Sequence, residues 1–424
     1  MRRDTPEQPT PVEPVSDSLR GLAGFGSGAE RRLLAVLCLA SVLSVVNFMA
    51  LSPFLPEIAR DLRTTVPLVG QVTAAITLLS AAAGLAIGPI ADRRGARRLM
   101  VGGVVCVGLN LLGTAFAPSY PVLLLLAVIG GLGDAILFGL PLAIAGTRFA
   151  GAARRRAIAW TSAALSFGGV VGVPVIAAVG GAFGWRAALA GVGLLALTAA
   201  PLVAAWLPGD AVAADGPFRL QALVAAYRPL VRHRPTLVLY ATNGLRAAAW
   251  IGVLTYLGAF LTDRFGLNPG EIGLVYMVTG IGVFLGNVSG ASRFGAIPLR
   301  WLIAAGAAVQ GVLLVALFAL PLAPAAATAV LLVGAFAGAV TFVGVATLLV
   351  AETPAGAGTT MVLNGSVFNL GSAAGAALGG GLLAVGGYEA MGVGRASFAL
   401  LAALLVLATG RADRPSRTSG VGGA

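Results

Sequence analysis

Two ionisable residues stand inside long apolar runs of this chain. Asp134 falls within the run 121–147, and Arg246 falls within the run 236–261. A charged side chain in the middle of a bilayer costs roughly 3 kcal/mol even on a lenient insertion scale. A carboxyl group near an arginine captures or releases a proton when a movement changes their separation. The pair therefore predicts proton-coupling chemistry. The alternatives are a static ion pair that pins two helices together, or polar groups satisfied by water.

The two residues are expected at similar depth. Counted at about 1.5 Å per residue, Asp134 lies roughly 20 Å from the start of its run and Arg246 roughly 15 Å from the start of its own. A hydrocarbon core is about 30 Å thick, so both positions fall near its middle.

Other polar side chains lie beside aromatic ones on predicted helix faces, which suits an amphiphilic ligand of moderate size. Hydrogen bonds between helices are an equally good explanation for each residue taken singly. The residues predicted to line a substrate cavity are Asn47, Phe48, Tyr240, Asn243, Trp250, Thr341 and Asn364.

Composition identifies the class of protein. Of the 424 residues, 58% are hydrophobic and 10% are charged, against roughly 25% charged in soluble domains. The chain is therefore an all-α integral membrane protein. Its net charge of +12 comes from 28 basic residues, all of them arginine. Most of these arginines fall in predicted turns on one side, so the charge reflects membrane topology and argues against nucleic-acid binding.

Twelve spanning helices are predicted, in two bundles of six. They cover roughly 33–55, 67–90, 99–117, 121–147, 157–182, 187–207, 236–261, 271–291, 299–320, 325–350, 358–385 and 391–409. The corresponding domains are a disordered cytoplasmic tail (1–32), a bundle (33–208), a linker with an amphipathic helix (209–235), a second bundle (236–409) and a cytoplasmic tail (410–424). Of the arginines, 22 lie in the tails and the turns after even-numbered helices and five, Arg395 among them, in the turns after odd-numbered helices. Both termini are therefore expected in the cytoplasm.

The turn between the second and third runs carries a motif, Gly-Pro-Ile-Ala-Asp-Arg-Arg-Gly-Ala-Arg-Arg from residue 88 to 98. It resembles the signature loop of the major facilitator superfamily, Gly-x-x-x-Asp-Arg-x-Gly-x-Arg-Arg. The matching residues are Gly88, Asp92, Arg93, Gly95, Arg97 and Arg98. A weaker copy, Ala-Ser-Arg-Phe-Gly at 291–295, lies at the equivalent place in the second half. The resemblance implies alternating access, with the binding site between two repeats near mid-membrane.

The signature loop suggests a conformational latch. The eleventh helix is expected to begin near Gly358, with its electropositive N-terminus at the same side of the membrane. Asp92 would cap that end while the inner gate is closed. Small residues at Gly371, Gly375 and Gly379 are expected to let this helix approach the other bundle closely.

The fifth run resembles the glycine-proline motif of the superfamily's proton-coupled exporters. Its elements are Gly168, Gly172 and Pro174, followed by Phe-Gly-Trp-Arg at 183–186. This form is similar to the drug, arabinose and chloramphenicol efflux branch. Those exporters carry an arginine in the fourth helix, where this chain has Ala127. The branch's usual proton relay therefore does not transfer to this chain.

The sequence thus predicts a secondary transporter and not an enzyme. The expected function is proton-coupled efflux of a small drug-like or natural-product molecule through a bacterial-type inner membrane. No catalytic residue, metal or cofactor is expected, and the proton gradient is the energy source. The predicted partners are the substrate, protons and the lipid bilayer, and a monomer is the superfamily's norm. The alternatives are uptake or facilitated transport of a metabolite such as a sugar and, more remotely, a membrane-embedded enzyme or a receptor.

Overall fold

The structure, a computed structural model, describes residues 27–209, 220–289, 297–354 and 356–410. Within these ranges the chain is helical and contains no strand. The first half holds α1 (Gly28–Met49), η3 (Ser52–Phe54), α2 (Leu55–Asp61), α3 (Val66–Arg94), α4 (Ala96–Ala115), α5 (Tyr120–Arg148), α6 (Gly151–Phe167), η4 (Gly168–Gly172), α7 (Val173–Phe183) and α8 (Trp185–Trp206). The second half holds α9 (Leu220–Arg232), α10 (Arg234–Phe265), α11 (Pro269–Ser289), α12 (Leu299–Ala319), α13 (Pro324–Glu352) and α14 (Ala357–Gly410).

The described helices form 11 segments long and apolar enough to span a membrane. The last segment is two helices joined at a kink, because Gly386 and Gly387 leave the helical conformation. Gly387 has a φ of 65°, in the left-handed region that glycine adopts readily. This kink falls between the eleventh and twelfth predicted spans, so the prediction of twelve spanning helices is confirmed.

Local signals set several helix ends. Ser27 and Glu30 form a capping box at the start of α1, in which each side chain accepts a hydrogen bond from the other residue's backbone N–H. Gly95, with a φ of 86°, ends α3 and opens α4 directly. The signature turn is therefore a single left-handed residue between two helices.

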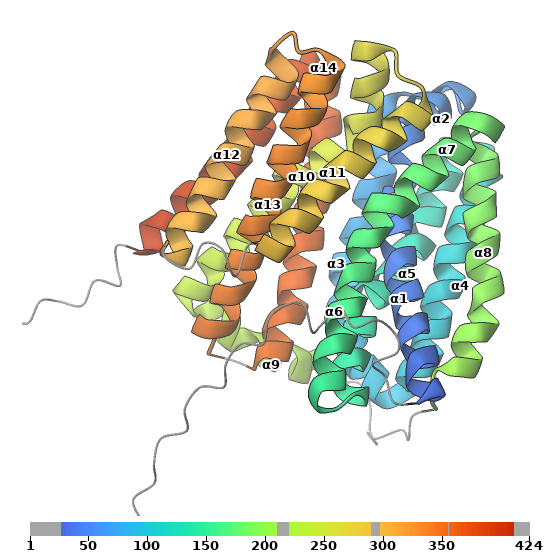
Figure 1. The fold of residues 1–424 in the computed structure, drawn as a ribbon, viewed down its shortest axis with the longest axis vertical. Coiled ribbons are helices and arrows are strands. Elements are labelled where there is room, and N and C mark those ends of the chain that lie inside the picture. The colour runs from blue at the N-terminus through green and yellow to red at the C-terminus, as the bar shows by residue number, and fades with distance from the viewer. Residues whose placement is uncertain (1–26, 210–219, 290–296, 355, 411–424) are drawn as a thin grey trace, which may run out of the picture.

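The helices of the two halves lie side by side as two groups (Figure 1). Within the first group α4 packs on α8 and α3 on α5, and within the second α10 and α12 pack on α14. The most extensive contacts between the groups are those of α3 with α14 and of α11 with α7. The predicted fold class, two six-helix bundles in a membrane, is confirmed.

The linker helix α9 lies against one end of the bundles, here called the α9 end. Leu230 is buried in a cluster with Leu239 and Tyr240 of the second bundle. The Tyr227 hydroxyl donates to the Leu85 carbonyl of α3, 3.2 Å away, and so reaches the first bundle. Val224 on the same helix is exposed. The predicted amphipathic helix is present, and part of its apolar face is covered by protein.

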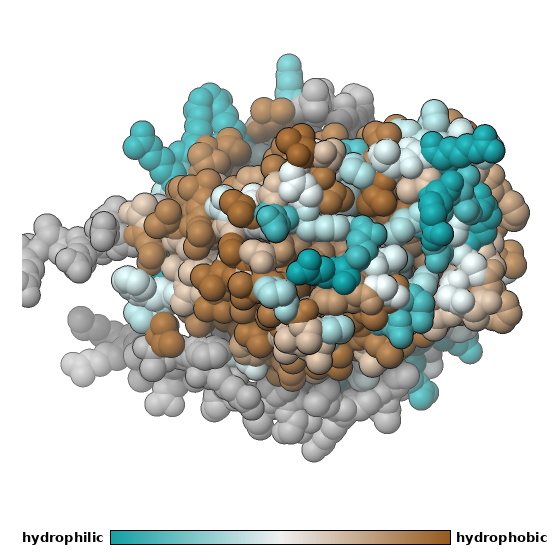
Figure 2. All heavy atoms as spheres, turned by 90° about the horizontal axis from the view of Figure 1, so that it is seen from above, coloured by the Kyte–Doolittle hydropathy of each residue, from teal (hydrophilic) through white to brown (hydrophobic). Residues whose placement is uncertain are grey.

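At the opposite end, here called the far end, η3 of the first bundle contacts α10 and α11 of the second. The Ser52 hydroxyl lies within hydrogen-bonding distance of the Leu254 and Thr255 carbonyls and of the Tyr276 hydroxyl. Nearby, Gln71 donates to the Ala377 carbonyl, 3.1 Å away. Seen from the far end, polar residues are scattered over a largely hydrophobic surface (Figure 2). These contacts hold the bundles together at the far end.

Candidate functional site

Asp134 lies in the middle of α5 and is buried, with 2% of its surface exposed. Its Oδ1 accepts a hydrogen bond of 2.7 Å from the Ser44 hydroxyl of α1, and Ser80 of α3 lies beside the carboxyl group. Glycines around Asp134 make this crowding possible. A Cβ on Gly131 would press on the backbone of α3, and one on Gly133 on the backbone of α4. Neutral hydroxyl groups therefore surround the carboxyl group, and they can donate the hydrogen bonds that a carboxylate accepts.

Ser80 connects this carboxyl group to the other bundle. Asn369 of α14 donates from Nδ2 to Ser80 Oγ at a distance of 2.9 Å. Ser80 has one hydroxyl proton, which is left for the Asp134 carboxyl group. The path Asp134–Ser80–Asn369 crosses the interface between the bundles. Its three members are buried.

Arg246 lies in the middle of α10 and is 5% exposed. Its Nε and Nη2 both donate to Asn243 Oδ1, at 3.3 and 3.0 Å. Its guanidinium carbon lies 5.0 Å from the ring centre of Phe342 and 5.5 Å from that of Phe368. These are distances at which a cation interacts favourably with a ring face.

Asp134 and Arg246 form no ion pair within the described part of the chain. Each is held by its own neighbours, Asp134 by serines and Arg246 by Asn243. One turn of α14 lies close to both clusters, because Phe368 contacts Arg246 and the adjacent Asn369 contacts Ser80. A static pair between the two charges is therefore not what holds the bundles together in this conformation.

The residues predicted to line a cavity divide into separate groups. Asn243 donates to Asn364 Oδ1, 2.8 Å away, so these two lie with Arg246. Tyr240 donates to the Thr360 carbonyl one turn further along the same pair of helices. Trp250 packs near Gly334 of α13.

Asn47 differs from this group. Its Nδ2 donates to the Gly130 carbonyl and its Oδ1 accepts from Asn110, so it is bonded inside the first bundle. Phe48 beside it is partly buried in the hydrophobic core, and the Thr341 hydroxyl donates to its own helix at the Ala337 carbonyl. The side chains of Asn47 and Thr341 thus form hydrogen bonds between helices or within one helix, in line with the alternative to a cavity-lining role.

The fifth-helix motif lies at two interfaces. Residues 168–172 form a turn of π-helix, η4, directly before Pro174. A Cβ on Gly168 or Gly172 would press on Val45 or Val46 of α1, in the same bundle. The backbone around Pro174 packs against Gly273 of α11, in the other bundle. The motif thus contains a π turn, a feature that often marks functional sites in helices.

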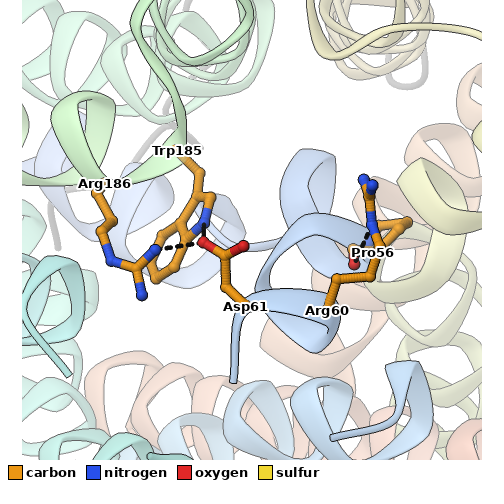
Figure 3. A network of polar contacts seen from close by, with 5 residues as sticks. All are labelled: Pro56, Arg60, Asp61, Trp185 and Arg186. Carbon is orange, nitrogen blue, oxygen red and sulfur yellow. Dashed lines mark hydrogen bonds and ion pairs between the residues drawn. The ribbon is translucent and has the colours of Figure 1, made fainter. Parts of the chain in front are cut away.

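The end of this motif joins the α7–α8 turn to α2 (Figure 3). The turn residue Gly184 has a φ of 85°. Trp185 Nε1 donates to Asp61 Oδ2 over 2.9 Å, and Arg186 forms an ion pair with the same oxygen. The Arg186 guanidinium also lies over the Trp185 ring, 4.3 Å from its centre. Asp61 therefore fixes α2 to the first bundle.

The latch residues lie where α3 meets α4. Arg93 Nη1 donates to the Pro89 carbonyl of its own helix, at 2.9 Å. Asp92 is exposed and makes no hydrogen bond to the described residues of α14. The cap on the eleventh helix is not formed in this conformation. The weaker copy of the motif, 291–295, lies outside the described residues.

Two expectations are wrong. Arg395 is not in a turn but in the second helix of α14, where it is fully buried. Its Nη1 and Nη2 donate to the carbonyls of Ala248 and Gly375. It is a third ionisable group inside the bundles.

The second correction concerns the glycines of α14. Gly371 and Gly375 pack against the backbone of α10, and Gly379 against Arg395, all within the second bundle. These residues bring helices of one bundle together and do not form the contact with the other bundle. Gly380 serves that contact instead, because a Cβ there would press on Gln71 and the Pro67 carbonyl of α3.

Comparison with known proteins identifies the family. The sequence profile of the Major Facilitator Superfamily matches residues 37–364. The chain belongs to the Major Facilitator Superfamily. It is 27% identical over 377 residues to the inner membrane transport protein YdhP of Escherichia coli, covering 84% of this chain and 90% of that protein. It is also 27% identical over 407 residues to the transcription regulatory protein OpdE of Pseudomonas aeruginosa, covering 92% and 96%.

Solved structures of this superfamily agree in fold. The crystal structure of a bacterial homologue of the human lysosomal transporter Spinster, inward-facing and unoccupied, superposes with a TM-score of 0.75 at 18% identity. It covers 93% of this chain and all of the other. As a member of the superfamily, this chain is a secondary transporter that works by alternating access, and not an enzyme.

Sequence reasoning did not single out Ser80, Phe342 and Phe368, which the structure places at Asp134 and Arg246, and it assigned Arg395 to a turn. The two phenylalanines sit in apolar helices, where aromatic residues are ordinary. Ser80 lies on the predicted second span and is one polar residue among several small ones. Only the burial of Arg395 could have been predicted from the sequence, because the residue falls within the predicted span 391–409.

Proposed function

We propose that this chain is a proton-coupled exporter of a small amphiphilic molecule, of drug or natural-product type, in a bacterial inner membrane. The α9 end is assigned to the cytoplasm. The signature turn and α9 carry arginines at that end, as the positive-inside rule requires of cytoplasmic segments. YdhP, named as an inner membrane transport protein, supports the same location.

One observation carries the proposal: the buried Asp134 carboxyl group lies beside Ser80, which accepts a hydrogen bond from Asn369 of the other bundle. An ionised carboxyl group only accepts hydrogen bonds, whereas a protonated one also donates. Proton binding at Asp134 therefore changes which groups Ser80 can bond. In this way the proton alters a contact that must break and re-form as the bundles rock.

Arg246 is proposed as the second charge of the coupling site. It lies at similar depth on the other bundle and shares α14 as a neighbour with the Asp134 cluster. Rocking of one bundle against the other changes the separation of the two charges, and with it the proton affinity of the carboxyl group. The coupling is thus electrostatic and needs no metal or cofactor.

The outward direction rests on the fifth helix. Its glycine-proline motif resembles that of proton-coupled exporters. In this chain it forms a π turn at the contact with α11. Single π turns of this kind inside α-helices occur frequently at functional sites.

The experiment combines direction and coupling. Cells lacking their own efflux pumps would express the chain and be exposed to a panel of drugs, with accumulation measured with and without a proton gradient. Asp134→Asn is expected to abolish gradient-dependent export, while Glu389→Gln, an exposed acid near the far end, should leave it intact. Full export by the Asp134→Asn variant would refute proton coupling through this residue. Faster accumulation inside the cell would show uptake, the alternative direction.

A further inference from the structure

Among the residues that the structure describes, no acid pairs with the buried cation Arg246. The mid-membrane acid Asp134 is bonded by Ser44 and lies beside Ser80, and the arginine is 5% exposed. Removing an arginine from water is costly unless its charge and its N–H groups are matched. The part of the chain that the structure describes offers Arg246 one amide oxygen and two ring faces.

Its hydrogen bonds leave donors unused. A guanidinium has five N–H donors in a planar fork. Nε and Nη2 share a single acceptor, Asn243 Oδ1. Nη1 has no acceptor among the residues that the structure describes. A planar anion such as a carboxylate is what this fork binds best, with two parallel hydrogen bonds.

A second donor lies next to it. Asn364 uses its Oδ1 to accept from Asn243 Nδ2 at 2.8 Å, which leaves its own NH2 group as a donor. The rings of Phe342 and Phe368 lie beside the guanidinium, and Phe138 of the first bundle stacks on Phe368 at a ring-centre distance of 6.0 Å. Two donors of the second bundle and aromatic rings of both bundles thus lie around Arg246.

Arg395 provides an internal comparison. It is also buried in the second bundle, and its Nη1 and Nη2 are each bonded to a backbone carbonyl. Gly252 and Gly379 leave the space that its guanidinium fills, because a Cβ at either position would overlap it. Backbone carbonyls therefore hold both terminal nitrogens of Arg395 and give it a structural role, while its buried Nε has no acceptor among the described residues. No comparable carbonyls meet Arg246 in the described structure.

We propose that Arg246 binds an anionic group, such as a carboxylate, on the transported molecule. Asn364 donates a further hydrogen bond to it, and Phe342 and Phe368 contact the apolar part of the molecule. This assignment deepens the proposed function, on which it rests, by giving the substrate class as amphiphilic organic anions.

The test uses three probes that share one apolar body and differ in charge: phenylbutyrate, phenylbutanol and phenylbutylamine. Binding to the purified full chain in detergent would be followed by thermal stability and by tryptophan fluorescence. The carboxylate is expected to bind at least about tenfold more tightly than the alcohol or the amine, a difference of about 1.4 kcal/mol. Tighter binding of the amine, or equal binding of all three, would overturn the assignment.

Variants locate the effect. Arg246→Gln is expected to remove the preference for the carboxylate and Arg246→Lys to retain part of it. Arg264→Gln, which removes the same charge from an exposed position, should leave the preference unchanged. An unchanged preference in a folded Arg246→Gln protein would overturn the assignment. If Arg246→Gln does not fold, the affinities of the native protein and of Arg246→Lys for the three probes still test the assignment.

Proton movement into liposomes separates this assignment from the function beneath it. If the amine but not the carboxylate drives proton movement, proton-coupled transport stands and the anion assignment fails. If the carboxylate binds through Arg246 but no probe moves protons, the anion assignment stands and proton coupling fails.

Discussion

Asn369 of the second bundle donates a hydrogen bond of 2.9 Å to Ser80 of the first, and Ser80 lies beside the Asp134 carboxyl group. This bond joins α3 and α14, the helix pair with the most extensive contact between the bundles. It lies at the height of the only acid that the structure places in mid-helix inside the bundles. The Asn369–Ser80 bond is therefore affected both by protonation of Asp134 and by the relative motion of the bundles.

Breaking this bond is expected to slow transport with little loss of stability. Ser80→Ala and Asn369→Ala should each reduce the proton-driven rate severalfold. The double variant should be no worse than the poorer single one, with a coupling energy of about 1 kcal/mol. Rates in proton-loaded liposomes measure the cycle. Thr77→Val is the control, because the Thr77 hydroxyl bonds only to carbonyls of its own helix. Additive effects of the two changes would show that the residues act separately.

The space around Arg395 predicts a stability difference between two neighbouring glycines. Gly379→Ala places a methyl group against the Arg395 guanidinium, and overpacking of this kind costs about 1–3 kcal/mol. Gly381→Ala meets no atom within 4 Å. Thermal unfolding in detergent is therefore expected to show a clear loss for the first variant and little change for the second. Equal melting temperatures would mean that Arg395 is not confined as described.

The contacts of Ser52 at the far end predict a conformational bias. Ser52→Ala removes its hydrogen bonds to α10 and Tyr276, and each net bond is worth about 1 kcal/mol. The population open at the far end should then rise by about fivefold or more. Spin labels at Thr65 and Asn268, exposed residues at this end, would report the separation of the bundles.

These labels require a background in which the two native cysteines, Cys38 and Cys106, are replaced. Ser41→Ala is the matched control, since the Ser41 hydroxyl bonds only to Leu37 of its own helix. An unchanged distance distribution in the Ser52→Ala protein would show that η3 does not hold this end closed.

The latch yields a prediction for the other conformation. In the present conformation Asp92 is exposed, so Asp92→Asn should leave stability unchanged within about 0.5 kcal/mol. If Asp92 caps the eleventh helix when the α9 end is closed, the same change should slow transport and favour the form open at that end. Transport rates and label distances across the α9 end would measure both effects, with Glu389→Gln as the control. Normal transport rates and label distances in the Asp92→Asn protein would refute the latch hypothesis.

The membrane spans were predictable because length and hydropathy dominate there. The turn at Gly95, the turn at Gly184 and the kink at Gly387 fall where apolar runs meet, and each needs a residue that adopts a positive φ. These signals are local in sequence. The depth of Asp134 and Arg246 follows from the same counting, since a helix rises by a fixed amount per residue.

Side-chain partners were less accessible to sequence reasoning. Asn47 was expected to face a cavity, but small rotations of a helix decide whether a polar residue faces the centre or a neighbour in its own bundle, and Asn110 and Gly130 are its partners here. The room for Arg395 comes from Gly252 and Gly379, which are far apart in the chain. No local sequence pattern predicts that these two glycines lie close together in the fold.

The bond between Asp61 and the Trp185–Arg186 pair has a mechanical consequence. It ties α2 to α8 on the outer flank of the first bundle, and η3 directly precedes α2 in the chain. The segment that closes the far end is thus a rigid extension of its own bundle. When the first bundle rotates, Ser52 moves with it and away from α10. Opening the far end therefore needs no separately moving lid.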